Sequence, residues 1–232
     1  MSGKYQLFLF PFSGGSASYY LKWKEKFDGS IQIFPIDYPG RGYRINEELV
    51  GDMKSLLDDL YCKIAESRDH NCPFGLFGHS MGATIAYELF FRFQQSSHAA
   101  PSHLFLSGRS APDMAEESIR NRHLYDSEQL KREVLSFGGT DSPHLLELFL
   151  PIIRNDFKVL ETFSAPKREP IINCKPVIFM GKEDVTTSGD AAEWGKHFLE
   201  PCNIYEFNGG HFFINDCYED MIRIMQSEID NA

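Results

Sequence analysis

The chain has 232 residues, 42% of them hydrophobic, which suits one domain with a substantial core. Its formal net charge of −10 argues against a nucleic-acid partner or an anionic membrane surface. Five cysteines without C-x-x-C spacing indicate neither a zinc site nor a disulfide framework, and we expect no metal and no cofactor. No apolar run approaches the roughly 18 residues that span a membrane, and the first predicted strand leaves no room for a signal peptide before it. We therefore expect a cytoplasmic protein.

Short strand-like runs alternate with helix-like stretches along the chain. The predicted strands are 5–10, 31–36, 74–77, 103–107, 176–180 and 203–207, and the predicted helices cover about 17–27, 52–67, 81–95, 190–199 and 215–229. Short apolar strands separated by helices are typical of a parallel sheet covered on both faces, with right-handed crossovers. We therefore predict one α/β domain over residues 1–232, with a mainly parallel sheet of at least six strands and helices on both faces.

The sequence Gly78-His79-Ser80-Met81-Gly82 lies between a predicted strand and a predicted helix. G-x-S-x-G at a strand-to-helix turn is the nucleophile elbow of the α/β-hydrolase fold, which exposes the central serine at the top of a sheet. Glycines are needed on both sides because a side chain there would strike the adjoining strand or helix. The motif is short enough to occur by chance, but its placement makes Ser80 the candidate nucleophile.

The interval between the strands at 103–107 and 176–180 is far longer than one crossover helix needs. It contains two helical patterns, 127–137 and 144–163. Because this insertion follows the strand next to the elbow strand, we predict a helical lid at about 110–165 above the strand ends. The alternative is an elaborated crossover without a gating role.

A serine hydroxyl needs a base to take its proton and a carboxylate to orient that base. In open-sheet hydrolases these groups follow in the order Ser, Asp or Glu, His, each after a strand. His211 is the one histidine of eight that directly follows a strand and a turn, and it is the predicted base. We favour Asp184 as the acid, and Asp113 is the alternative. The other histidines are predicted to pack beside the elbow (His79) or to lie on the surface (His70, His98, His103, His123, His144 and His197).

A tetrahedral intermediate needs two backbone N–H donors for its oxyanion. One is expected from Met81, the residue after the nucleophile. The other is expected from the loop at 11–16, which occupies the place of the HGGG-type segment of esterases. Phe12 and Ser13 are both candidates for this second N–H.

The chain resembles the type II thioesterases that accompany nonribosomal peptide and polyketide synthases. The likeness covers nearly the whole chain and rests on an ordered series of motifs: LFPFSGGS at 9–16, YPGRG at 38–42, FGHSMG at 77–82, SGRSAP at 107–112, GGT at 138–140, LPIIRNDF at 150–157, Trp194, and GGHFF at 209–213. One departure is Thr186-Thr187-Ser188-Gly189 after Asp184, where apolar residues are more usual in that family.

The resemblance implies hydrolysis of acyl thioesters from the phosphopantetheine arm of carrier domains, which removes misprimed or stalled acyl groups. It favours Asp184 as the acid, and it implies a mobile lid over the acyl pocket and no cofactor beyond the phosphopantetheine of the substrate. The expected partners are acyl-loaded carrier domains, and we expect a monomer. The alternatives are a carboxylesterase or lipase, an acyltransferase of small acyl substrates, or a non-catalytic module that binds carrier domains.

Overall fold

The structure is a computed structural model that describes residues 5–96, 99–115, 121–138, 143–171, 173–187 and 191–231. At its centre is a six-stranded sheet in the order β2-β1-β3-β4-β5-β6, in which every neighbouring pair is parallel. The strands are β1 (Tyr5–Phe10), β2 (Ile31–Pro35), β3 (Phe74–His79), β4 (His103–Ser107), β5 (Lys175–Gly181) and β6 (Asn203–Phe207). The predicted strands and the parallel sheet are confirmed.

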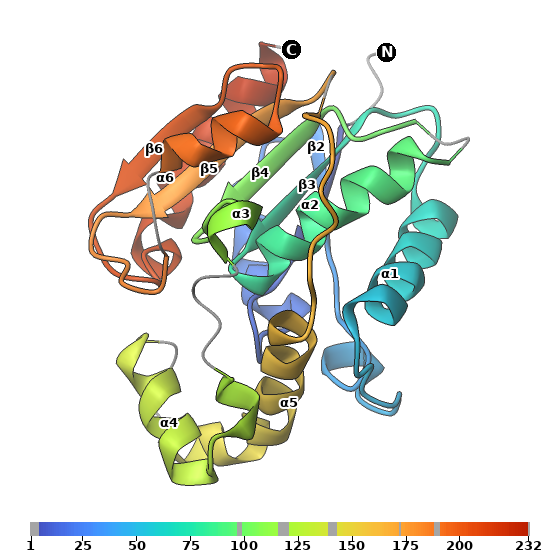
Figure 1. The fold of residues 1–232 in the computed structure, drawn as a ribbon. Helices are drawn as coiled ribbons and strands as arrows, with labels where there is room; N and C mark the ends of the chain where they lie inside the picture. The colour runs from blue at the N-terminus through green and yellow to red at the C-terminus, as the bar shows by residue number, and fades with distance from the viewer. Residues whose placement is uncertain are drawn as a thin grey trace.

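Helices connect these strands and cover the sheet. The α-helices are α1 (Met53–Ser67), α2 (Met81–Gln94), α3 (Pro112–Ala115), α4 (Ser127–Ser136), α5 (Pro143–Glu161) and α6 (Ile214–Asp230). The stretches predicted at 17–27 and 190–199 form shorter 3-10 helices, η1 (Ala17–Trp23) and η5 (Ala191–His197), and two further single turns are η2 (Gly42–Arg44) and η4 (Arg122–Leu124). In Figure 1, α1 and α2 lie on one face of the sheet and α6 on the other. Among the described helices, none has the length and apolar character to cross a membrane.

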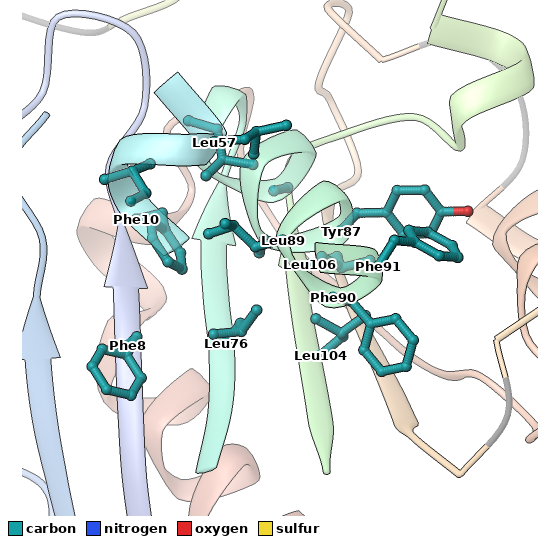
Figure 2. Close-up of a cluster of buried hydrophobic side chains, with 14 of the residues drawn as sticks. Phe8, Phe10, Leu57, Leu76, Tyr87, Leu89, Phe90, Phe91, Leu104 and Leu106 are labelled. Carbon is teal, nitrogen blue, oxygen red and sulfur yellow. The ribbon is translucent and has the colours of Figure 1, made fainter. Parts of the chain in front are cut away.

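The sheet separates two hydrophobic clusters, because successive strand residues point to opposite faces. Phe8, Leu76 and Leu104 are register partners on β1, β3 and β4, and they face α2 (Figure 2). Phe77 and Phe105 point the other way and pack in the cluster that contains residues of η1 and α6. Burial on both faces explains why these strands are continuous apolar runs in the sequence.

The insertion between β4 and β5 contains α3, η4, α4 and α5. Figure 1 shows α4 and α5 at the end of the sheet to which the strand arrows point. The N-terminus of α4 carries a capping box, in which Asp126 Oδ1 accepts from the Gln129 N–H at 2.8 Å and Gln129 Oε1 accepts from the Asp126 N–H at 3.1 Å. Leu130 of α4 packs against α5. The helices of the insertion thus lie at the strand ends, and their role as a lid stays a prediction.

The predicted surface position of His103 is wrong. Its side chain is 1% exposed, within β4. Its Nδ1 lies 3.0 Å from the Tyr5 hydroxyl, and its ring stacks on Phe105 at 5.6 Å between centroids. Burial lowers the pKa of His103 to about 4. His123 and His197 are also partly covered, in contact with acidic side chains.

Several residues singled out from the sequence lie outside the described part of the chain. They are His98, Gly139, Thr140, Ser188 and Gly189.

Candidate active site

Ser80 stands at the turn between β3 and α2. Its φ of 56° and ψ of −113° form a conformation that non-glycine residues rarely adopt. A Cβ at Gly78 would lie 2.0 Å from the backbone of Gly82, and a Cβ at Gly82 would lie 2.1 Å from the carbonyl oxygen of Phe10. The close approach of strand and helix therefore requires both glycines, and the predicted elbow geometry is confirmed.

The Ser80 hydroxyl faces the imidazole of His211. Ser80 Oγ lies 3.0 Å from Nε2, and Asp184 Oδ2 lies 2.8 Å from Nδ1. The three residues follow β3, β6 and β5, so the parallel sheet brings residues distant in sequence to one edge. Such a chain of groups can move a proton from a hydroxyl to an imidazole whose other nitrogen is held by a carboxylate.

The alternative acid, Asp113, is not brought to His211. It lies on α3, its side chain is 70% exposed, and its Oδ2 is 3.6 Å from Nε2 of His197. The structure therefore places Asp184, the residue favoured from the sequence, beside His211, and its role as the acid stays a prediction.

Thr186 holds the carboxylate of Asp184. Its backbone N–H and its hydroxyl donate to Oδ1 at 2.9 Å and 2.6 Å, and the same hydroxyl lies 2.8 Å from Nδ1 of His211. Burial raises the pKa of Asp184, but hydrogen bonding and the charge of His211, with the hydrogen bonds of Thr186, outweigh it and hold the pKa below its usual value. The sequence marked Thr186 only as a departure from the family pattern, and this role was not predicted.

The loop after β1 faces the elbow, as the sequence predicts. Phe12 and Ser13 line the same cavity as Ser80. The hydroxyl of Ser13 donates to Sδ of Met81 at 3.6 Å, and the N–H of Gly15 closes a tight turn onto the carbonyl of Phe12 at 2.9 Å. The two backbone segments expected to bind an oxyanion thus lie side by side.

His79 packs beneath the site, as predicted. Its ring is fully buried, its Nδ1 lies 2.9 Å from the Ser107 hydroxyl, and its centroid is 5.1 Å from that of His211. Burial, with the nearby His211, holds the pKa of His79 well below its usual value, which favours a neutral ring. His79 thus packs against the imidazole of His211.

A cavity extends from Ser80 toward the helices of the insertion. Its apolar wall includes Phe137, Phe157, Leu160 and Trp194. The ring of Phe137, at the end of α4, lies 6.1 Å from that of His211, so the insertion reaches over the imidazole. The lining also includes the charged residues Glu88, Arg109, Arg122 and Glu161. A cavity that joins apolar side chains to Ser80 and His211 suits an acyl chain attached to a reactive carbonyl. In the ranges that the structure describes, no group of three or more His, Cys, Asp or Glu side chains could hold a metal ion.

Comparison with known proteins places this site in a family. The thioesterase domain model matches residues 5–229. Linear gramicidin dehydrogenase LgrE of Brevibacillus parabrevis is 30% identical over 234 residues, which cover 97% of this chain and 88% of LgrE. Thioesterase PikA5 of Streptomyces venezuelae is 30% identical over 222 residues, which cover 93% of this chain and 78% of PikA5.

A solved structure agrees over the whole fold. The type II thioesterase BorB from the borrelidin biosynthetic cluster has a TM-score of 0.86 and 28% sequence identity, covering 98% of this chain and 94% of BorB. The chain belongs to the thioesterase family and has its α/β-hydrolase fold.

Proposed function

We propose that this protein is a type II thioesterase that hydrolyses acyl thioesters on the phosphopantetheine arm of carrier domains. In this role it removes misprimed or stalled acyl groups during nonribosomal peptide or polyketide synthesis. The observation that carries the proposal is that Ser80, His211 and Asp184 are hydrogen-bonded in series, with Ser80 and His211 in the lining of a cavity that has apolar side chains along its wall. The likeness to the type II thioesterase BorB supports the choice of a carrier-bound thioester.

In the proposed reaction, Nε2 of His211 takes the proton of Ser80 Oγ while this oxygen attacks the thioester carbonyl carbon. Asp184 keeps Nδ1 protonated and stabilises the imidazolium. The C–S bond then breaks, the imidazolium gives its proton to the departing pantetheine sulfur, and the acyl group stays on Ser80. His211 next takes a proton from a water molecule, whose oxygen attacks the acyl carbon. The bond between this carbon and Ser80 Oγ then breaks, the imidazolium returns its proton to Oγ, and the carboxylic acid leaves.

The negative charge on the tetrahedral oxygen is held by the N–H of Met81 and the N–H of Phe12 or Ser13. Each such donor contributes about 2.7–4 kcal/mol to transition-state stabilisation in enzymes of this kind. These donors act in a site partly closed from water by the insertion, which strengthens their effect. The proposed reaction uses no bound cofactor, because the pantetheine belongs to the substrate.

The helices at about 110–165 serve as a lid that admits the acyl group to the cavity in this proposal. Cytoplasmic location and a monomeric state stay predictions. The name of LgrE describes a dehydrogenase, but we propose hydrolysis for this chain because its proton-transfer chain ends on a hydroxyl nucleophile, Ser80.

The test compares leaving groups with the acyl group held constant. We expect kcat/KM for acyl-loaded carrier domains and acyl-pantetheine to exceed that for the p-nitrophenyl ester of the same acid. Rapid hydrolysis of the simple ester without turnover of the carrier thioester would instead indicate a carboxylesterase. Transfer of the acyl group to an added alcohol or amine in preference to water would indicate an acyltransferase.

A further inference from the structure

A buried ion pair joins α5 to the loop after β2, and its carboxylate also binds the loop after β1. Arg41 and Asp156 form two hydrogen bonds of 2.6 Å, NH1 to Oδ2 and NH2 to Oδ1. Their side chains are 4% and 2% exposed. Oδ2 of Asp156 also accepts the backbone N–H of Gly14 at 2.7 Å. One carboxylate therefore links three segments: the insertion, the loop after β2 and the loop after β1.

The contacted backbone is the loop that faces the elbow. Gly14 follows Ser13 directly and has a φ of +77°, and a Cβ there would lie 2.5 Å from Cγ1 of Ile153 on α5. NH1 of Arg41 also lies 3.4 Å from the carbonyl oxygen of Gly15. The ion pair therefore holds the backbone on the C-terminal side of both candidate oxyanion donors.

We infer that Asp156 is a positioning residue for the oxyanion loop, and that its ion pair with Arg41 fixes the direction of the N–H supplied by Phe12 or Ser13. This inference rests on the proposed function. Charge-assisted hydrogen bonds are shorter and stronger than neutral ones, and buried ones are little screened by salt. An oxyanion donor must be fixed to within a fraction of an ångström, since small misplacements cost large factors in rate.

The neighbouring residues of α5 bind elsewhere. NH1 of Arg154 donates to the carbonyl of His123 at 2.9 Å, within the insertion, and Nδ2 of Asn155 donates to the carbonyl of Val50 at 2.8 Å. Only Asp156 of these three reaches the oxyanion loop in the described contacts. The R-x-D part of the L-P-x-x-R-x-D-F motif thus joins α5 to η4 through Arg154, and to the loops after β1 and β2 through Asn155 and Asp156.

A single substitution would leave one buried charge without its partner and destabilise the fold. The double variant Arg41→Met/Asp156→Leu removes both charges together with the acceptor of the Gly14 N–H. We expect its kcat to fall about tenfold to hundredfold, with KM nearly unchanged, since the misplaced donor acts in the transition state. Affinity for an acyl trifluoromethyl ketone, whose adduct with Ser80 carries an oxyanion, falls with kcat, whereas affinity for an unreactive acyl thioether does not.

Asn155→Ala is the matched control, because it removes a bond between α5 and the core without touching the oxyanion loop; we expect wild-type kcat. A folded double variant with wild-type kcat and wild-type ketone affinity overturns the inference. So does an equal loss of ketone and thioether affinity, which would indicate general disruption. If the wild-type protein hydrolyses no thioester, the proposed function is wrong. The attachment of the loop at 11–16 to Asp156 can still be measured independently.

That measurement is amide hydrogen exchange on the wild-type protein, which requires no variant to fold. We expect the N–H of Gly14, which donates to Asp156, to exchange as slowly as the N–H groups of 153–157, and both to exchange more slowly than the N–H groups of Phe12 and Ser13. Exchange of the Gly14 N–H at the rate of the Phe12 and Ser13 N–H groups would contradict the attachment.

Discussion

Thr186 Oγ1 lies 2.8 Å from Nδ1 of His211, the same ring nitrogen that faces Asp184. The hydroxyl has a single hydrogen, which it donates to Oδ1 of Asp184 at 2.6 Å, so toward the imidazole it acts as an acceptor. Both neighbours of Nδ1 therefore favour the tautomer with a proton on that nitrogen. The free lone pair is then on Nε2, opposite Ser80, where a general base requires it.

Replacement of the Thr186 hydroxyl tests its contribution to kcat. Thr186→Val keeps the backbone N–H bond to Asp184 but loses the hydroxyl, and we expect kcat to fall roughly tenfold, the effect of about 1–2 kcal/mol. Thr186→Ser keeps a hydroxyl and should retain most of the activity. Steady-state kinetics on one acyl-pantetheine decides the matter; equal losses in both variants would exclude the hydroxyl as the cause.

The choice of acid gives a second prediction. Asp184→Asn leaves the imidazole without its carboxylate and lets the wrong tautomer form, which should lower kcat by about 10⁴. Asp113→Asn changes an exposed side chain on α3 and should leave kcat within twofold of wild type. The reverse order of effects would move the acid to the end of β4.

Buried His103 gives a prediction for stability. Because burial lowers its pKa to about 4, the unfolded chain binds a proton between the ordinary histidine value and about 4 while the folded chain does not. Stability therefore falls as pH falls through this window, by about 1–2 kcal/mol between pH 7 and pH 5 for this residue.

Urea unfolding at pH 7 and pH 5 measures this difference. In His103→Gln the change in unfolding free energy between the two pH values should be smaller than in wild type, although His79 still contributes in the same direction. An identical change in both proteins would show that His103 is not the source.

The cap of α4 predicts local stability within the insertion. Asp126→Ala removes the capping box and should destabilise the first turn of α4 by about 1 kcal/mol. Hydrogen exchange should become faster at 127–131 and stay unchanged at 153–157. Asp52→Ala, which removes the corresponding cap of α1, is the control and should affect that helix alone. Equal acceleration along α5 would mean that the two helices open as one unit.

The strands, the turn that holds Ser80 and the position of His211 beside it were predictable from the sequence, because each has a local signal. Ser80 has flanking glycines, and His211 follows a strand and a turn. The spacing alone left two acids open. In the structure Asp184 contacts His211, whereas Asp113 is exposed and faces His197. The choice between Phe12 and Ser13 as the oxyanion donor stays open.

Contacts between distant residues could not be predicted. His103 looked like a surface residue because its partner Tyr5 is 98 residues away. The pairing of Arg41 with Asp156 spans 115 residues, and neither motif that contains these residues indicates the other. A polar side chain in a buried position is explained by its partner, and the partner is known only once the chain is folded.

In the proposed function, Ser80 is the nucleophile that hydrolyses carrier-bound thioesters. Intact-mass measurement of an acyl-loaded carrier domain, incubated with wild-type protein or with Ser80→Ala, tests this role. We expect wild type to return the carrier to its free-thiol mass with release of the acid, and the variant to leave the acyl group in place. Unloading by Ser80→Ala at the wild-type rate would contradict it.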